Sequence, residues 1–193
     1  TATKETRNNI TAHFFFMSGG TSEYDNRYRI DHPRIIELIK HIQKRGHAIG
    51  FHPSFDAFKD SGMFRQEKEK LEAIVAGATD TGRHHFLRFE VDTTWKIWEE
   101  NHMQWDSSMS YADKAGFRCG VCYPFPVFSV TERRKLDLYE RPLILMEQSL
   151  FQYEGLDNVR SIEKIKKLKS EVRKYQGEFV FLWHNSSFHV GPW

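Results

Sequence analysis

Short apolar runs alternate along this chain with longer segments that have the periodicity of amphipathic helices. The runs that predict strands cover residues 11–17, 48–52, 83–89, 142–151 and 178–183. Helical patterns lie between them, at residues 31–45, 59–76, 93–101 and 157–176. Because parallel strands need a crossover connection, this alternation predicts βαβ units. We therefore expect the five runs to be neighbours in one largely parallel, curved sheet of an α/β protein.

The composition narrows the class of protein further. The 193 residues contain no linker, repeat or low-complexity tract, which predicts one domain over residues 1–193. With 28 Lys and Arg against 26 Asp and Glu and no basic stripe, we expect no nucleic-acid partner. No run of 18 apolar residues exists, so we expect no membrane span. Ten histidines make metal chemistry worth testing.

Histidines stand at or near the ends of three predicted strands. His52 ends the run at 48–52, His85 lies in the run at 83–89, and His184 follows the last run. The carboxyl ends of parallel strands are where α/β enzymes hold their functional side chains. A single histidine is more often a hydrogen-bonded core or rim residue, but three such placements favour one shared site. The remaining candidates are interpreted as surface or packing residues: His13, His32, His41 and His102.

Side-chain alternation in the run at 83–89 places Arg83 and His85 on one face of the predicted strand and His84 on the other. We therefore expect Arg83 and His85 to enter one cleft together.

The two cysteines, Cys119 and Cys122, form a C-x-x-C pair without the second pair that a zinc ribbon needs. They lie in a segment that is too rich in glycine and proline to open a helix, as a thioredoxin-type dithiol would. They are interpreted as two ordinary thiols.

Several motifs, in their order along the chain, carry a family resemblance. Residues 11–16 are TAHFFF, residues 46–55 are GHAIGFHPSF, residues 83–88 are RHHFLR, residues 106–108 are DSS, and residues 182–184 are LWH. With GFR at 116–118 and CYPF at 122–125, the chain resembles the polysaccharide deacetylases of carbohydrate esterase family 4 over nearly its whole length. The resemblance implies a distorted, incomplete (β/α) barrel of about seven strands, a divalent metal that is usually zinc, and removal of N- or O-linked acetyl groups from a sugar or polysaccharide substrate.

The chain departs from the family pattern at two metal-site positions. The second histidine of the family's His-x-x-x-His motif falls on Asp56, and the proline of Arg-x-Pro-Tyr falls on His85. A histidine gained in one motif where another is lost suggests that His85 is the replacement ligand beside His52, with Asp56 as the competing ligand. If His52 and His85 share one ion, their nitrogens should lie roughly 3–4 Å apart, given zinc–nitrogen bonds near 2 Å.

The resemblance also implies roles for other residues. His184 would protonate the leaving group as general acid, and Arg83 would orient an upstream carboxylate that acts as base. Asp106 could orient His184 or line the cleft, and a capping or loop role is equally open. Trp183, Phe125 and Tyr123 are candidates for stacking on a sugar ring or for plain packing.

The family's Asp-Asp strand should precede Thr11, where this chain has only ten residues. We therefore expect a domain truncated at its N-terminus, inactive as it stands and weak in metal binding. Two alternatives stay open. One is a catalytically silent carbohydrate-binding or scaffold domain with the same fold, and the other is a metal-dependent hydrolase acting on a non-sugar amide.

Overall fold

The structure is a computed structural model that describes residues 11–190. The expectation about the segment before Thr11 lies outside these residues. The chain forms two compact units. The first contains the residues up to Asp106 together with Pro126–Leu138, and the second contains Ser107–Phe125 and the residues from Tyr139 onward. Each unit is described by itself, and the expectation of a single domain stays a prediction.

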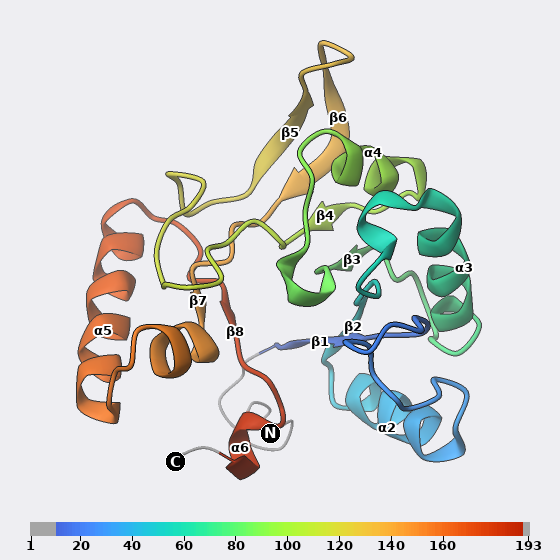
Figure 1. Ribbon diagram of the computed structural model, residues 1–193, viewed down its shortest axis with the longest axis horizontal. Coiled ribbons are helices and arrows are strands. Elements are labelled where there is room, and N and C mark those ends of the chain that lie inside the picture. Colours follow the sequence, from blue (N-terminus) through green and yellow to red (C-terminus); the bar gives the residue numbers. More distant parts are fainter. Residues whose placement is uncertain (1–10, 191–193) are drawn as a thin grey trace. The chain divides into compact units, whose positions relative to one another are not determined.

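The first unit is built on a parallel arrangement of short strands (Figure 1). These strands are β1 (His13–Phe16), β2 (Ala48–Phe51), β3 (Thr81–Gly82) and β4 (Trp105–Asp106). Each pairs in parallel with the next, and β1 and β2 run in register from His13 opposite Ala48 to Phe16 opposite Phe51. The hairpin strands β5 (Phe125–Ser129) and β6 (Arg134–Glu140) complete the sheet in the order β1-β2-β3-β4-β6-β5.

Three helices and two short turns of 3₁₀-helix accompany these strands. They are α2 (Pro33–Lys44), η1 (Ala57–Lys59), α3 (Ser61–Glu72), η2 (His85–Leu87) and α4 (Thr93–Glu100). Local capping explains where two of them begin, because Nδ1 of His32 accepts a hydrogen bond from the Arg34 amide and Asp60 accepts one from the Met63 amide. The chain leaves α2 through Gly46, whose φ of 78° suits glycine.

Buried aromatic rings hold α3 and α4 to the sheet. Phe51 of β2 packs edge to face against Phe64 of α3, with ring centroids 4.9 Å apart, and Phe64 meets Trp98 of α4 at 5.5 Å. All three side chains are fully buried. At the centre of the sheet, a Cβ atom on Gly82 would overlap the carbonyl oxygen of Phe51. Glycine is therefore required where β3 approaches β2.

The second unit contains a smaller parallel pair, β7 (Leu145–Met146) and β8 (Phe181–Leu182), in register from Leu145 opposite Phe181. Its helices are the π-helical turn η3 (Ser149–Tyr153), α5 (Asn158–Lys174) and the short α6 (Ser187–Val190). The apolar core joins Cys122, Ile144 and Val172. Cys119 and Cys122 carry thiols rather than a disulfide.

The structure confirms an α/β protein with a mostly parallel sheet and corrects several details of the sequence analysis. The predicted single sheet is wrong, because the described strands lie in two sheets. The predicted strand at 83–89 is also wrong, since Phe86 and Leu87 have φ values of 57° and 52°, which an extended strand cannot adopt. In the run at 142–151 only Leu145–Met146 is extended, and the chain then turns into η3.

The β5–β6 hairpin was not predicted. Its strand β6 buries Leu136, Leu138 and Glu140 and exposes the residues between them, which is the alternation expected of a half-buried strand. The surrounding charged residues mask that pattern in the sequence. Among residues 11–190, no helix is long and apolar enough to cross a bilayer.

Candidate functional site

The first unit brings His52 and His85 together. Nε2 of His52 lies 3.1 Å from Nδ1 of His85, with the two rings nearly perpendicular at 79°. This confirms the expected closeness of the two nitrogens, whereas any role in binding a metal stays a prediction. Both side chains are half-buried, so the pair lies at the boundary between the interior of the unit and solvent.

Backbone carbonyls fix the tautomer of each imidazole ring. Nδ1 of His52 donates to the carbonyl oxygen of Arg83 at 2.6 Å, and Nε2 of His85 donates to that of Tyr24 at 2.7 Å. A neutral imidazole has only one N–H, so the two nitrogens that face each other both carry lone pairs. Two lone pairs at this distance are stable together only when they share a cation, either a proton or a metal ion. The use of the other N–H on a backbone carbonyl is typical of metal-ligating histidines.

Two carboxylates hold the loop that follows His52. Glu67 of α3 accepts hydrogen bonds from the Ser54 amide at 2.9 Å and from the Ser54 hydroxyl at 2.6 Å. Asp25 accepts one from the Phe55 amide at 2.8 Å. Burial raises the pKa of Glu67, although the hydrogen bonds from Ser54 oppose this rise. The loop is therefore fixed at two consecutive amides directly after the histidine.

His85 begins a tight turn with a strained backbone. Its amide donates to the carbonyl oxygen of Pro53 at 3.2 Å, and the next two residues, Phe86 and Leu87, lie in the left-handed region. That conformation costs about 1–2 kcal/mol for each residue with a side chain. The turn, rather than strand alternation, directs His85 toward His52.

Arg83 and His84 occupy buried positions. The guanidinium of Arg83 lies 5.2 Å from the centre of the Phe15 ring, and its proposed work on an upstream carboxylate stays a prediction. His84 packs beside Phe64 and Trp98 with ring centroids 5.9 and 5.6 Å away. Burial, with the nearby charges of His52 and Arg88, holds the pKa of His84 well below its ordinary value of 6.5.

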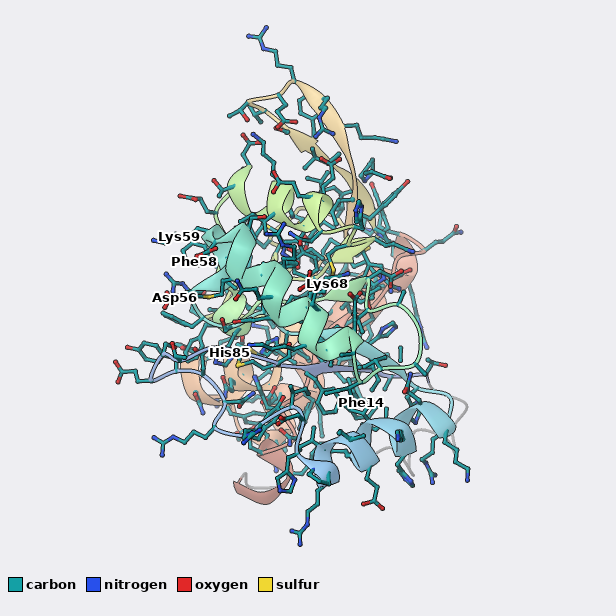
Figure 2. The ribbon with its side chains drawn as sticks, turned by 90° about the vertical axis from the view of Figure 1, so that its right-hand side faces the viewer. Phe14, Asp56, Phe58, Lys59, Lys68 and His85 are labelled. Atoms are coloured by element: carbon teal, nitrogen blue, oxygen red, sulfur yellow. The ribbon has the colours of Figure 1, made fainter. Side chains whose placement is uncertain are left out.

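The two aspartates of the predicted site occupy different surroundings in the first unit. Asp56 pairs with Arg88 at 3.0 Å and is largely exposed (Figure 2). The guanidinium of Arg88 also stacks over the rings of Phe55 and Phe58, at 3.9 and 4.0 Å from their centres. Asp106 is fully buried in β4, opposite Gly82 of β3. Its predicted role toward His184 stays untested.

A second arrangement of polar groups lies in the second unit. Nδ1 of His184 donates to Oε1 of Glu147 at 2.6 Å, and the Ser187 hydroxyl donates to the same oxygen at 2.7 Å. The Glu147 side chain is 2% exposed and that of His184 is 38% exposed. Burial raises the pKa of Glu147, but the hydrogen bond and charge of His184 and the hydrogen bond of Ser187 bring the net pKa below its ordinary value of 4.5.

Sequence reasoning missed Glu147. The signal was present, because Glu147 directly follows β7 and is the first polar residue after the apolar residues 142–146. The register of β7 with β8 places the residues after the two strands next to each other. Bound through Nδ1, the His184 ring is left with Nε2 to give or take a proton. Of the three proposed stacking residues, Tyr123 is exposed, and Phe125 and Trp183 are half-buried.

Within residues 11–190, no three His, Cys, Asp or Glu side chains are arranged to hold one metal ion. If the histidine pair holds a metal ion it would supply two ligands, and a complete catalytic site would need a further one. The sequence matches no model of a known protein family, and it matches no curated protein.

Proposed function

We propose that this chain is a metal-dependent hydrolase that removes N- or O-linked acetyl groups from a polysaccharide or sugar. The observation that carries the proposal is the pair of facing nitrogens on His52 and His85. The order of the motifs described above supports the substrate class. The distorted, incomplete barrel is proposed from the resemblance alone, since the described strands form two sheets.

The histidine pair fits a zinc ion as two of its ligands. Two nitrogens bound to a tetrahedral zinc at about 2.0–2.1 Å lie about 3.3 Å apart, close to the 3.1 Å between Nε2 of His52 and Nδ1 of His85. A carboxylate would complete the set, either Asp56 or an aspartate of the family's Asp-Asp strand. When bound, a divalent ion at this place would polarise the acetyl carbonyl and acidify a water molecule.

The other proposed steps belong to residues that move or position protons. We assign His184 as the general acid, which protonates the leaving amine or alkoxide through Nε2. Glu147 accepts a hydrogen bond from Nδ1 of that ring and fixes the direction in which Nε2 points. Arg83 would orient the carboxylate that removes a proton from water, and Asp106 keeps its proposed place lining the cleft.

Zinc binding tests this proposal without needing activity. Metal-free protein would be titrated with zinc against a chromophoric chelator, for the wild type and for His52→Ala, His85→Ala and His41→Ala. His41 is an exposed histidine of α2 and serves as the matched control. We expect each change in the pair to weaken zinc binding at least about tenfold and the control to leave it unchanged. Equal zinc affinity in all four proteins would refute the metal site.

A catalytically silent carbohydrate-binding domain is the second candidate. It is favoured by the finding that, within residues 11–190, no third His, Cys, Asp or Glu side chain joins the histidine pair to hold one metal ion. Acetate release from acetylated chitin oligomers and acetylated xylan, measured for this chain and for one extended upstream to include the family's Asp-Asp strand, separates the two candidates. Zinc-dependent release supports the hydrolase, and sugar binding without release supports the silent domain. Release from non-sugar amides alone would point to the third class, a hydrolase with another substrate.

A further inference from the structure

Three aromatic rings from separate segments meet beside the histidine pair. The rings of Tyr24 and Phe55 lie 4.5 Å apart, and the Phe86 ring stands edge-on to both at 5.6 Å. Tyr24 is 49% exposed and Phe86 is 60% exposed. The His85 ring touches that of Phe86 at 4.7 Å, and its Nε2 binds the Tyr24 carbonyl. The cluster is thus an exposed aromatic surface in direct contact with one of the two candidate metal ligands.

A cation–π contact, an ion pair and backbone hydrogen bonds hold this aromatic surface in place. Arg88 stacks on the Phe55 ring at 3.9 Å and is itself fixed by Asp56 at 3.0 Å and by the Phe55 carbonyl at 2.9 Å. The amide of Phe55 is bound by Asp25. Phe86 is presented to solvent from a left-handed backbone conformation that its side chain disfavours. Strain that keeps a large apolar ring in water is typical of a ligand-binding position.

We propose that the exposed rings of Tyr24 and Phe86, with Phe55 packed against both, form an aromatic platform that packs against one sugar ring of an acetylated polysaccharide. This inference rests on the proposed function and assigns residues to its substrate class. A pyranose ring has an apolar face of C–H groups that packs on aromatic rings, and its hydroxyl groups point outward to polar partners. Here the polar partners are the charged pair Asp56 and Arg88 and the imidazole of His85, which border the rings.

The size and surroundings of the platform favour a sugar over a membrane or a partner protein. Three rings give an apolar area much smaller than an amphipathic helix presents to a bilayer. The bordering ion pair of Asp56 and Arg88 carries no net positive charge, so it supplies no attraction to anionic lipid. Two exposed rings with polar groups at their border are the recognition pattern of a small hydroxylated ligand.

Binding of soluble oligosaccharides tests the platform directly. The full chain, kept in a chelator so that metal plays no part, would be titrated calorimetrically with the tetramer of N-acetylglucosamine and with acetylated xylotetraose. We expect at least one to bind, Phe86→Ala to weaken that binding about fivefold to tenfold, and Phe86→Tyr to retain it. Phe128→Ala is the matched control, because Phe128 is 54% exposed on β5 and lies outside the platform.

The outcomes distinguish this inference from the proposed function. Unchanged affinity in Phe86→Ala, or no binding of either oligosaccharide by the wild type, overturns the platform. Phe86→Leu keeps apolar bulk without a ring, so undiminished binding by this variant also overturns stacking. Ring-dependent binding combined with no acetate release, either from this chain or from a zinc-treated chain extended upstream to include the family's Asp-Asp strand, keeps the platform and refutes the hydrolase. Far-UV circular dichroism of each variant confirms that the folds compared are the same.

Discussion

Glu147 and His184 follow two paired parallel strands, and Oε1 of the first lies 2.6 Å from Nδ1 of the second. The carboxylate is buried while the imidazole reaches solvent. A buried acceptor of this kind fixes the orientation of the ring and leaves its other nitrogen available. This relationship also links the stability of the second unit to pH.

Replacing Glu147 by glutamine should remove a contribution to stability that depends on pH. The pKa of Glu147 is lowered in the folded protein, so its contribution is complete above the unfolded value of 4.5 and is lost as pH falls through the folded value. We expect Glu147→Gln to reduce the free energy of unfolding by about 1–3 kcal/mol at pH 6. Urea denaturation at pH 6 and at pH 3 measures the difference in the free energy of unfolding between the wild type and this variant. The difference should be smaller at pH 3. A loss equal at both pH values would contradict this account, and Glu163→Gln, an exposed carboxylate of α5, is the control.

His84 should make the protein sensitive to mild acid. Its pKa lies well below 6.5 in the folded state, so the unfolded chain binds the extra proton first as pH falls below 6.5. The stability is therefore complete above pH 6.5 and falls by about 1.4 kcal/mol per pH unit until the folded value is reached. In His84→Gln this part of the slope should vanish. Urea denaturation between pH 7.5 and 5.5 gives the slopes, and a slope unchanged from that of wild type would rule out a neutral, buried His84. His41→Gln serves as the exposed control.

Gly19 and Glu67 should be energetically coupled. A Cβ atom on Gly19 would overlap the side chain of Glu67, so Gly19→Ala should destabilise the protein by about 1–3 kcal/mol. In the Glu67→Ala background that overlap disappears and the same change should cost less. A double-mutant cycle from chemical denaturation measures the difference, and strict additivity would show that the two sites do not touch. Gly62→Ala in α3, where a Cβ has room, should stabilise by about 0.5–1 kcal/mol.

At Phe86, in the left-handed turn, a glycine variant should be more stable than an alanine variant, which reverses the usual order of stability. Because φ is positive there, Phe86→Gly should be more stable than Phe86→Ala by about 1 kcal/mol. At Phe128, in the extended strand β5, glycine should instead be the less stable by about 0.5–1 kcal/mol. Thermal denaturation of the four variants compares the two positions. The same order at both would mean that Phe86 does not hold this conformation in solution.

Periodicity in the sequence predicts the elements whose burial follows a simple pattern. The strands His13–Phe16 and Ala48–Phe51 lie in short continuous runs of mostly apolar residues. The helices Pro33–Lys44 and Asn158–Lys174 lie where apolar residues repeat at helical spacing. The strand predicted at 83–89 fails because backbone conformation there is decided by tertiary contacts. Neither Phe86 nor Leu87 is a residue type that signals a left-handed turn.

In the candidate site, too, the sequence predicts some features, whereas tertiary contacts decide others. Motif order was enough to bring His52 and His85 together, but the strand predicted to carry His85 is not how the chain achieves it. Their proximity depends on the turn at His85 and on two backbone carbonyls, which no side-chain pattern reveals. Glu147 was missed because its role depends on a two-residue strand pair that is too short to give a periodic signal.

The close approach of Gly82 to the carbonyl oxygen of Phe51 limits how this chain can diversify. Any side chain at position 82 would push β3 away from β2, and the residues that follow β3 include both Arg83, whose carbonyl orients His52, and His85 itself. A library of all amino acids at this position should return only glycine from a selection for folded protein. The distance between His52 and His85 thus depends on the absence of a side chain at position 82. Substitutions that change the site without unfolding the protein therefore have to lie in the loops around it.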